Sequence, residues 1–336
     1  MLTDIFARRY EQPCLWETFL EVHRRLLAQG FQLLSDVRSH DEEFWTRIHD
    51  LLARELGLKE LYPRYWGLHT AQDPYHSGPY TAAQMCEKWM QQAFDGKQAA
   101  DRFIKERLSL VEIGLRQHEN FVAELNAKLA DNIAAAELFD QRGQRKGLLV
   151  PGHTANRVRA TNASLNAKIQ NAVNELNVRF RQADFKLHYH NGFIQISEDQ
   201  AVAQAIEMPF WKLVSGAKWR NVDHDMKEAI DLRDTGGRDP ARYAAHALES
   251  TIKIISDEKQ LTRGNEKGAA NFIDNLRGAK LIEVWEMEAL KHFFSRVRNP
   301  IGHGPGAAPM PGLTDHQTSW AIENCMIWIK SLIRRM

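Results

Sequence analysis

The sequence predicts an all-α protein with two helical domains and one small β-hairpin. Three observations favour this fold class. Apolar residues recur at helical spacing through most of the 336 residues. Asp239 followed by Pro240 is a typical helix start. The clearest β signal is one pair of short alternating runs around Asn191 and Gly192, a dipeptide that favours a tight turn.

Helical periodicity dominates the N-terminal half. The helices expected there cover residues 16–35, 41–56, 97–141 and 158–182. The third is one long helix, or two in line, with a coiled-coil-like seam, because it contains no proline and Gly114 is its only internal glycine. Residues 60–80 are rich in proline and aromatic side chains, so they predict an ordered loop. Residues 143–156 predict a break between helices.

The predicted hairpin separates two halves of the chain. Its strands cover residues 184–190 and 193–197, and Asn191-Gly192 accepts the positive φ values of a type I′ turn. A lone hairpin is marginal in water, so we expect it to lean on helices. Together with a length sufficient for about two domains, this predicts a domain of residues 1–197 and a second of residues 198–336.

The C-terminal half is also predicted to be helical. The expected helices cover residues 199–217, 222–234, 240–257, 268–276, 282–298 and 314 to the end. Asp239 is expected to cap the helix that begins at Pro240. Thr314 and Gln317 have the spacing of a capping box for the last helix.

Composition limits the classes of protein. No run approaches the roughly 18 apolar residues of a membrane helix, so we expect no membrane partner. Cys14, Cys86 and Cys325 are far apart and odd in number, which gives neither a disulfide framework nor metal-ligand spacing. With no secretory signal at the start, the sequence predicts a cytoplasmic protein that needs no metal or cofactor.

The net charge of +1 gives no global attraction to nucleic acid, but charge is distributed unevenly. Residues 141–190 contain nine Lys and Arg against two acidic residues. Such a stretch is a candidate phosphate-binding surface. The alternative is that it forms a solvated helix face without a ligand. The candidate RNA-binding side chains are Arg142, Arg145, Lys146, Arg157 and Arg159.

The candidate catalytic residues lie in the segment SRVRNPIGHG. Pro300 disfavours helical geometry at Asn299, so the preceding helix should end near Arg298 and His303 returns within five residues. Eight of the thirteen residues 300–312 are Pro or Gly, which predicts a loop between two apolar helices. Loops held between core elements often carry function.

An arginine and a histidine in this arrangement suit metal-free RNA cleavage. Guanidinium binds a phosphate through two parallel N–H bonds, and imidazole exchanges a proton near neutral pH. His303 would remove the 2′-OH proton, Arg298 would stabilise the phosphorane, and Asn299 would orient the substrate or a histidine. A two-fold homodimer would supply a second His303 for the leaving oxygen. On spacing alone, the alternative is an Arg298 paired with a carboxylate and a His303 that caps a turn.

Other residues are candidates for supporting this site. Glu249 and Lys253 lie opposite the apolar face of the helix 240–257, where Glu249 either orients Arg298 or His303, or simply pairs with Lys253. His188 and His190 share one face of a strand, but without a third ligand we interpret them as ordinary hairpin residues. Trp219, between Lys218 and Arg220, is interpreted as a buried side chain rather than a base-stacking platform.

Two parts of the sequence resemble a known family. The segments PARYAAHALESTIKII (240–255) and VRNPIGHG (297–304) resemble the abortive-infection C-terminal group of HEPN domains. The segments MLTDIFARRY…LWETFLEVHRRLLAQGF and YHNGFIQIS resemble the N-terminal domains of AbiJ-like phage-defence proteins. The HEPN signature is an Arg, often with a polar residue directly after it, and a His a few residues later. It maps onto Arg298, Asn299 and His303, although Arg296 also satisfies the spacing.

The resemblance implies a helical bundle that dimerises and a ribonuclease that acts on tRNA or mRNA during phage infection. It also implies that activity is held in check until a phage-derived trigger arrives, with the N-terminal domain as regulator or sensor. HEPN domains can also be non-catalytic. The alternative is therefore a module that binds RNA or a protein partner without turnover.

Overall fold

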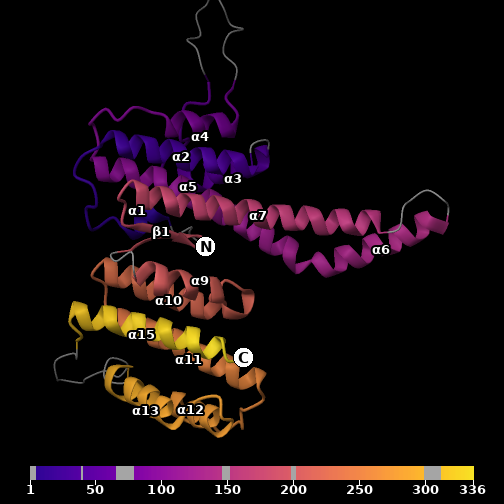
Figure 1. Ribbon diagram of the computed structural model, residues 1–336. Coiled ribbons are helices and arrows are strands. Elements are labelled where there is room, and N and C mark those ends of the chain that lie inside the picture. Colours follow the sequence, from indigo (N-terminus) through magenta and orange to yellow (C-terminus); the bar gives the residue numbers. More distant parts are fainter. Residues whose placement is uncertain (1–4, 39–40, 66–78, 146–151, 198–201, 299–311) are drawn as a thin grey trace, which may run out of the picture. The chain divides into compact units, whose positions relative to one another are not determined.

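The computed structural model describes residues 5–38, 41–65, 79–145, 152–197, 202–298 and 312–336. In this part of the chain it is helical apart from one two-stranded hairpin and an isolated bridge, which confirms the predicted fold class. The chain folds into two compact units, residues 1–194 and 195–336 (Figure 1). The sequence places the domain boundary at 197/198, three residues later. Loops are predicted for residues 60–80 and 300–312, and most of each of these two segments lies outside the described residues.

The helices of the first unit are α1 (Phe6–Arg9), α2 (Glu21–Arg38), α3 (Glu42–Glu55), α4 (Ala82–Met90), α5 (Ala100–Ala127), α6 (Leu129–Arg145) and α7 (His153–Gln182). The hairpin consists of β1 (Leu187–His190) and β2 (Phe193–Ile196). Helix α5 is the centre of this unit, since α1, α2, α3 and α7 all pack against it. Every residue from Phe103 to Leu115 is buried.

Helix α2 approaches α5 closely at two glycines. A Cβ on Gly114 would overlap the side chain of Leu34, and one on Gly30 would lie 3.1 Å from Val111. Gly114 therefore marks a contact between helices rather than a break in α5. The predicted helix 97–141 is in fact two consecutive helices, the second of the two alternatives, because α5 ends at Ala127 and α6 begins at Leu129.

Two helices are absent from the sequence-based prediction. Helix α1 is only four residues long, too short for a periodic pattern. Helix α4 could have been predicted from its start, because Thr81 and Gln84 have the spacing of a capping box and form a complete one in the structure. The expected first helix also begins later than predicted, at Glu21 instead of residue 16.

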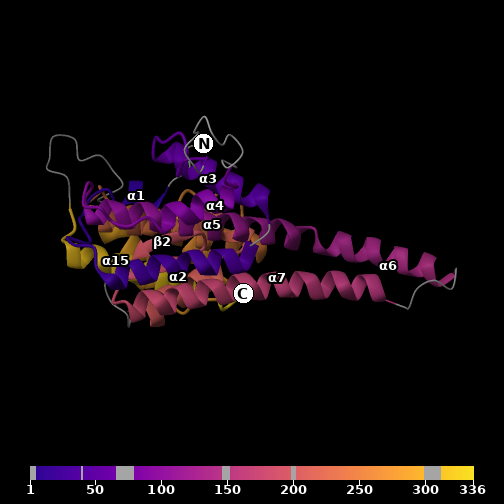
Figure 2. The ribbon, with the colours of Figure 1, turned by 90° about the horizontal axis from the view of Figure 1, so that it is seen from above.

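Helices α6 and α7 form an antiparallel arm. Figures 1 and 2 show α6 and the N-terminal half of α7 extending side by side away from the rest of the first unit. Asp140 fastens the outer end, since its carboxylate accepts from Thr154 N at 3.0 Å and from Ala155 N at 3.2 Å. These contacts cap α7, whose Gly152 offers no side chain for the purpose.

The hairpin has the predicted turn, with Asn191 at φ 42° and Gly192 at φ 86°. It leans on α7, where Asn177 donates to Tyr189 O at 2.9 Å and accepts from Tyr189 N at 2.7 Å. It also leans on a buried ionic network around Glu112 of α5, which accepts from Ile194 N at 2.8 Å.

Glu112 is fully buried and receives two guanidinium groups, those of Arg9 and Arg116. Arg9 also donates to Ile194 O at 2.7 Å, and Arg116 donates to Gly192 O at 2.6 Å. Burial acts to raise the pKa of Glu112, but the two arginines outweigh it and hold the pKa below its ordinary value. The network therefore joins α1, α5 and the hairpin, including two segments that carry the family resemblance.

The second unit is a helical bundle. Its elements are the π-helix η1 (Ala203–Glu207), α9 (Met208–Val214), the 3₁₀-helix η2 (Ala217–Trp219), α10 (Arg220–Asp234), α11 (Pro240–Glu258), α12 (Ala269–Gly278), α13 (Val284–Phe293), the π-helix η3 (Phe294–Arg298) and α15 (Asp315–Ile333). Helix α11 lies in the centre and packs against α10, α12 and α15. Its predicted apolar face, which includes Leu248 and Ile252, is fully buried.

The ends of these helices test the predicted caps. Thr314 and Gln317 form the predicted capping box. Helix α11 does begin at Pro240, but the prediction for Asp239 is wrong: its backbone is left-handed (φ 55°) and its side chain makes no capping bond. Its carboxylate instead accepts from Arg238 Nε at 3.1 Å. No helix in the described residues is both long and apolar enough to cross a membrane.

Candidate functional site

The candidate site is built on the exposed side of α11. His246, Glu249 and Lys253 are spaced at i, i+3 and i+7, so they share one face of this helix. The opposite face is anchored in the core of the second unit, which fixes the backbone beneath these side chains. Preorganised polar groups on a rigid element are what a phosphate-transfer site requires.

Arg298 approaches this face from another element. The helix that follows Leu281 continues through α13 into η3, and η3 ends at Arg298, where the sequence predicted the helix to end. A π-helical turn widens the backbone and is frequent at functional sites. The five residues of η3 therefore set the direction in which Arg298 leaves the bundle.

Glu249 lies between two cations. Its Oε1 is 2.8 Å from Lys253 Nζ, and its Oε2 is 3.5 Å from Arg298 Nη2. The first is a good ion pair, and the second is at the limit of a hydrogen bond. A quarter of the Arg298 side chain is exposed, so this side chain contacts Glu249 and is still partly accessible to solvent. Glu249 therefore pairs with Lys253 and also contacts Arg298.

His246 lies within electrostatic reach of Arg298, and Asp225 lies within reach of His246. Burial and the positive charge of Arg298 lower the pKa of His246, although Asp225 of α10 and Glu249 act in the other direction. Burial raises the pKa of Asp225, against the opposing influence of His246 and His224. Sequence reasoning missed Asp225, because its position in α10 gives no sign of proximity to His246 of α11.

Two of the predicted catalytic residues, Asn299 and His303, lie outside the described residues. Arg296, the alternative arginine, is exposed on η3, and Arg298 rather than Arg296 contacts Glu249. The structure therefore brings together Arg298, Glu249 and Lys253. A cavity of about 410 Å³ in the same unit is lined by residues of the α10–α11 turn and the start of α15, and it includes none of these three.

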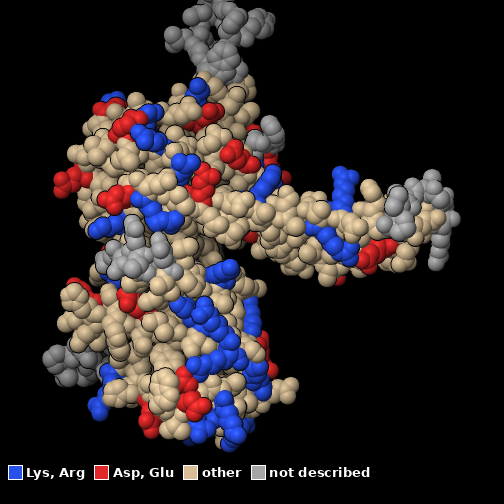
Figure 3. Space-filling model, in the orientation of Figure 1, with Lys and Arg blue, Asp and Glu red and all other residues tan. Residues whose placement is uncertain are grey.

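The candidate RNA-binding arginines lie on the arm. Arg142 is exposed on α6, and Arg157 and Arg159 are exposed on α7. Arg159 is paired with Glu137 at 2.7 Å. Arg145 is the last residue of α6, its side chain is not described, and Lys146 lies outside the described residues. Figure 3 shows Lys and Arg side chains along the arm together with an acidic group, so this face is not of one sign.

The remaining histidine and tryptophan candidates have structural environments. His188 and His190 are buried, and their rings stack with centroids 5.7 Å apart. Within the described ranges, no group of three or more His, Cys, Asp or Glu side chains is arranged to hold a metal ion. Trp219 is buried beneath Lys218, whose ammonium is 4.6 Å from the indole centroid, and this confirms its interpretation as a packed side chain.

Comparison with protein families identifies the family to which the N-terminal part of the chain is similar. The family model for AbiJ N-terminal domain 4 matches residues 4–212. This chain belongs to that family. The match confirms the AbiJ resemblance seen in the segments around Arg9 and the hairpin, and it indicates a protein of abortive-infection defence. A search among curated proteins and a search among solved structures gave no match.

The AbiJ N-terminal domain match extends beyond the first compact unit. It includes residues 195–212, and thus η1 and the first part of α9, but it ends before α10. Glu249, Lys253 and Arg298 all lie C-terminal to it. The chemistry of the second unit therefore has to be argued from its own side chains.

Proposed function

We propose that this AbiJ-family protein is a metal-independent endoribonuclease of the HEPN type that acts on tRNA or mRNA in defence against phage. The observation that carries the proposal is the placement of Arg298. Its side chain ends a helical segment, contacts Glu249 at 3.5 Å, and is one quarter exposed to solvent. Guanidinium in this state suits an RNA phosphate.

In the proposed reaction, the RNA 2′-oxygen attacks the adjacent phosphorus. His303 takes the 2′-OH proton, the P–O2′ bond forms, and the P–O5′ bond breaks. The partner subunit's His303 gives a proton to the departing 5′-oxygen. The products are a 2′,3′-cyclic phosphate and a 5′-OH. Arg298 stabilises the negative charge of the phosphorane, and Asn299 orients the substrate or a histidine.

Glu249 and Lys253 have supporting roles in this proposal. Glu249 limits the rotamers of Arg298, and Lys253 prevents the carboxylate from neutralising Arg298 completely, because it shares the negative charge at 2.8 Å. The charges of Glu249 and Lys253 cancel, so the group of three keeps the positive charge of Arg298, which favours an anionic ligand. Arg296, exposed on the same π-helical segment, would contact the flanking phosphate.

The homodimer that the reaction requires is supported by exposed apolar side chains of the second unit. Trp285 on α13 is 65% exposed and Trp320 on α15 is 54% exposed. Large apolar side chains in solvent are typical of interfaces. The Trp320 ring lies 6.2 Å from that of Phe293, five residues before Arg298. An interface around Trp320 would therefore bring two copies of the Arg298 segment close together.

The experiment is a cleavage assay with total tRNA and with an mRNA, in the presence of EDTA. We compare the protein as it is with His303→Ala and with His316→Ala, a matched histidine substitution outside the proposed site. Cleavage by the parent and by His316→Ala, with 2′,3′-cyclic phosphate ends and loss in His303→Ala, is the expected result. Cleavage that survives His303→Ala, or that requires a divalent metal, contradicts the mechanism.

A second candidate function is binding without turnover. It is favoured by the arm, where the exposed Arg142 and Arg157 lie on the same helical hairpin as Leu138 and Phe139, which are 56% and 59% exposed. Exposed aromatic and guanidinium groups together suit RNA bases and phosphates. Expression in cells distinguishes the candidates: a nuclease slows growth and Arg298→Ala relieves it, whereas a binding module slows growth in neither form.

A further inference from the structure

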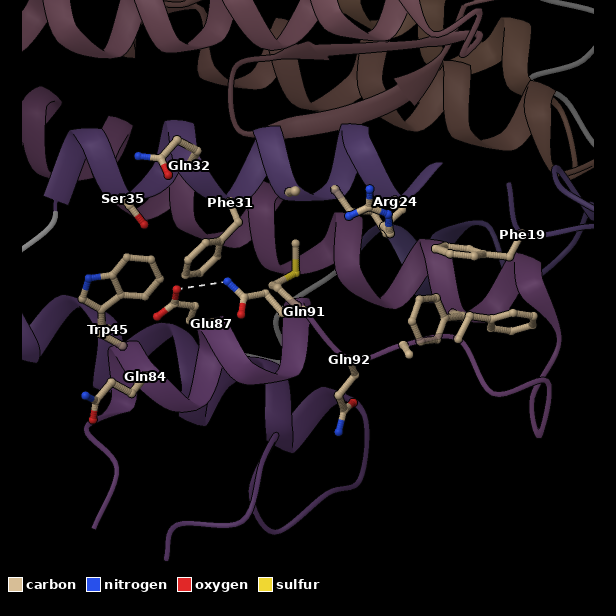
Figure 4. Close-up of a pocket in the computed structure, with 17 residues that line it drawn as sticks. Phe19, Arg24, Phe31, Gln32, Ser35, Trp45, Gln84, Glu87, Gln91 and Gln92 are labelled. Atoms are coloured by element: carbon tan, nitrogen blue, oxygen red, sulfur yellow. Dashed lines mark hydrogen bonds between the residues drawn. The ribbon is translucent and has the colours of Figure 1, made fainter. Parts of the chain in front are cut away.

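The first unit contains a groove of about 570 Å³ that the proposed reaction does not use. Figure 4 shows it between α2 and α4, with Trp45 toward one end and Phe19 toward the other. The volume is in the range of ligand-binding sites, roughly 300–1,000 Å³. No residue of the second unit lines it, so it is a property of the first unit alone.

Two helices supply the walls of the groove as regular stripes. The stripe of α2 is Arg24, Leu27, Ala28, Phe31, Gln32 and Ser35. The stripe of α4 is Ala83, Gln84, Glu87, Met90 and Gln91. Both follow the i, i+3, i+4, i+7 spacing of a helix face. The α2 stripe runs from Arg24 to Ser35, and its eleven steps of 1.5 Å give about 16 Å, or three turns of a helix.

The floor of the groove is apolar and built from buried side chains. Leu27, Trp45, Met90 and Phe103 are at most 7% exposed. At one end, Phe19, Phe94 and Phe103 form a cluster with ring centroids 5.1–5.2 Å apart. The space between two helix faces over such a floor is the position that a further helix occupies in a bundle.

The charges of the lining argue against nucleic acid or a nucleotide. Arg24 is paired with Glu21 within its own helix, and Glu87 accepts from Gln91 at 3.0 Å. The other polar residues of the rim are uncharged. An anionic ligand needs cations that are not already compensated. An amphipathic peptide fits this groove better, because its apolar face can pack on the aromatic floor while its polar edges contact the uncharged amides and hydroxyl of the rim.

The two charged groups also lie apart along the groove. Figure 4 places Arg24 toward the Phe19 end, and Glu87 beside Phe31 toward the Trp45 end. Because Arg24 is already paired with Glu21, Glu87 is the charge that an occupant has to match, and a complementary occupant carries a basic side chain toward the Trp45 end. A helix of a protein partner can place such a side chain beside a long apolar face, whereas a neutral aromatic molecule cannot.

We propose that this groove binds an amphipathic α-helix of a partner protein, with apolar side chains at i, i+3 or i+4 and i+7 and a basic residue facing Glu87. Met90 in the floor suits such an occupant, because its flexible thioether adapts to different apolar side chains. The proposal does not depend on the nuclease, because peptide binding is measured without RNA.

The test uses a displayed library of helical peptides of about 14 residues, roughly four turns. Apolar residues occupy i, i+3, i+4 and i+7, and the other positions are random. A library with the same composition but scrambled spacing is the control. The full-length protein should enrich peptides from the helical library that carry a basic residue toward one end. Equal enrichment from both libraries overturns the proposal.

Variants then locate the binding site. Ala28 is an exposed residue of the α2 stripe, and Ala134 is an exposed residue of α6 outside the groove. Ala28→Trp should fill the groove and weaken an enriched peptide by at least about tenfold, on the order of one buried anchor residue. Ala134→Trp should change binding by less than about twofold. Equal melting temperatures for both variants establish that folding is intact.

Charge reversal tests the orientation. Glu87→Lys should weaken an enriched peptide, and replacing the basic residue of that peptide by Glu should restore binding. Unchanged affinity in Ala28→Trp contradicts the assignment of the groove. A saturable signal with free indole or adenosine, and no enriched peptide, would assign the groove to a small aromatic ligand and overturn the proposal as well.

Discussion

Each of the two units contains a glutamate that contacts two cationic side chains. The two glutamates differ in burial and in the number and length of the contacts that their carboxylates accept. Glu112 in the first unit is fully buried and receives Arg9, Arg116 and the backbone N–H of Ile194. Glu249 in the second unit is 15% exposed, holds Lys253 at 2.8 Å and reaches Arg298 only at 3.5 Å.

The difference separates a structural site from a candidate functional one. The guanidiniums of Arg9 and Arg116 also donate to backbone carbonyls of the hairpin, so their geometry is fixed by the fold. The contact of Arg298 with Glu249 is long, and the carboxylate is shared with Lys253. The contact with Glu249 can be exchanged for one with a phosphate at little cost, whereas Arg9 and Arg116 would have to give up buried contacts with Glu112 and the hairpin.

The largest expected effect concerns Glu112. Glu112→Ala removes the carboxylate and leaves two buried guanidiniums uncompensated, so we expect a loss of about 3–5 kcal/mol in the free energy of unfolding. Chemical denaturation followed by circular dichroism measures it. Glu249→Ala is the matched control and should cost no more than about 1 kcal/mol, as for other partly exposed ion pairs. Equal losses in the two variants would contradict the comparison.

The second effect is on activity. Arg298→Ala should lower RNA cleavage by about 10²- to 10³-fold, the range for loss of one preorganised group that stabilises a transition-state charge. Its melting temperature should stay close to that of the parent, because the contact of Arg298 with Glu249 is long and partly exposed. Arg296→Ala is the comparison and should lower cleavage less than Arg298→Ala, because a contact with the flanking phosphate adds to binding and does not stabilise the transition-state charge. If Arg296→Ala were the more damaging change, the catalytic arginine would have to be reassigned.

A smaller change is expected for Glu249→Gln. The amide keeps the shape of the side chain but loses the charge that orients Arg298, so we expect cleavage to fall by at most about fivefold, equivalent to roughly 1 kcal/mol. The effect should appear in kcat more than in KM if Glu249 positions Arg298 for the transition state. Lys253→Met would then cause a change of similar or smaller size.

The most subtle expectation is the pH dependence of stability. The folded-state pKa of Glu112 lies below the ordinary value of 4.5. Its contribution is therefore fully present above about pH 4.5 and is lost as pH falls through the folded pKa. Thermal melts over this range should show a smaller loss on acidification in Glu112→Gln than in the parent. Parallel curves for the two proteins would show that Glu112 does not titrate with unfolding.

Much of the fold follows from local sequence signals. Helix periodicity, the Asn191-Gly192 turn and the Thr314 capping box each depend on residues a few positions apart. Arg298 was located as a helix end because Pro300 restricts the residue before it. Asp239 is the counterexample, since a good capping residue adopted a left-handed backbone and paired with Arg238.

The ionic networks could not be predicted in the same way. Glu112 and Arg116 are four residues apart and look like a surface pair of a helix, while Arg9 is 103 residues and Ile194 is 82 residues away from Glu112. Glu249 was identified because it lies opposite an apolar face, but its contact with Arg298 spans 49 residues. Tertiary packing determines these pairs, and no local pattern specifies it.

The position of Glu112 has a consequence for the way the chain acquires its structure. One ligand of this carboxylate is Arg9 of α1, and another is Ile194, the last residue of the first unit. A nascent chain that has not yet released residue 194 from the ribosome leaves this buried anion without its backbone donor. Since domains generally fold as units during synthesis, we expect the first unit to complete its folding only after the hairpin emerges, shortly before the segment that contains Arg298 is translated.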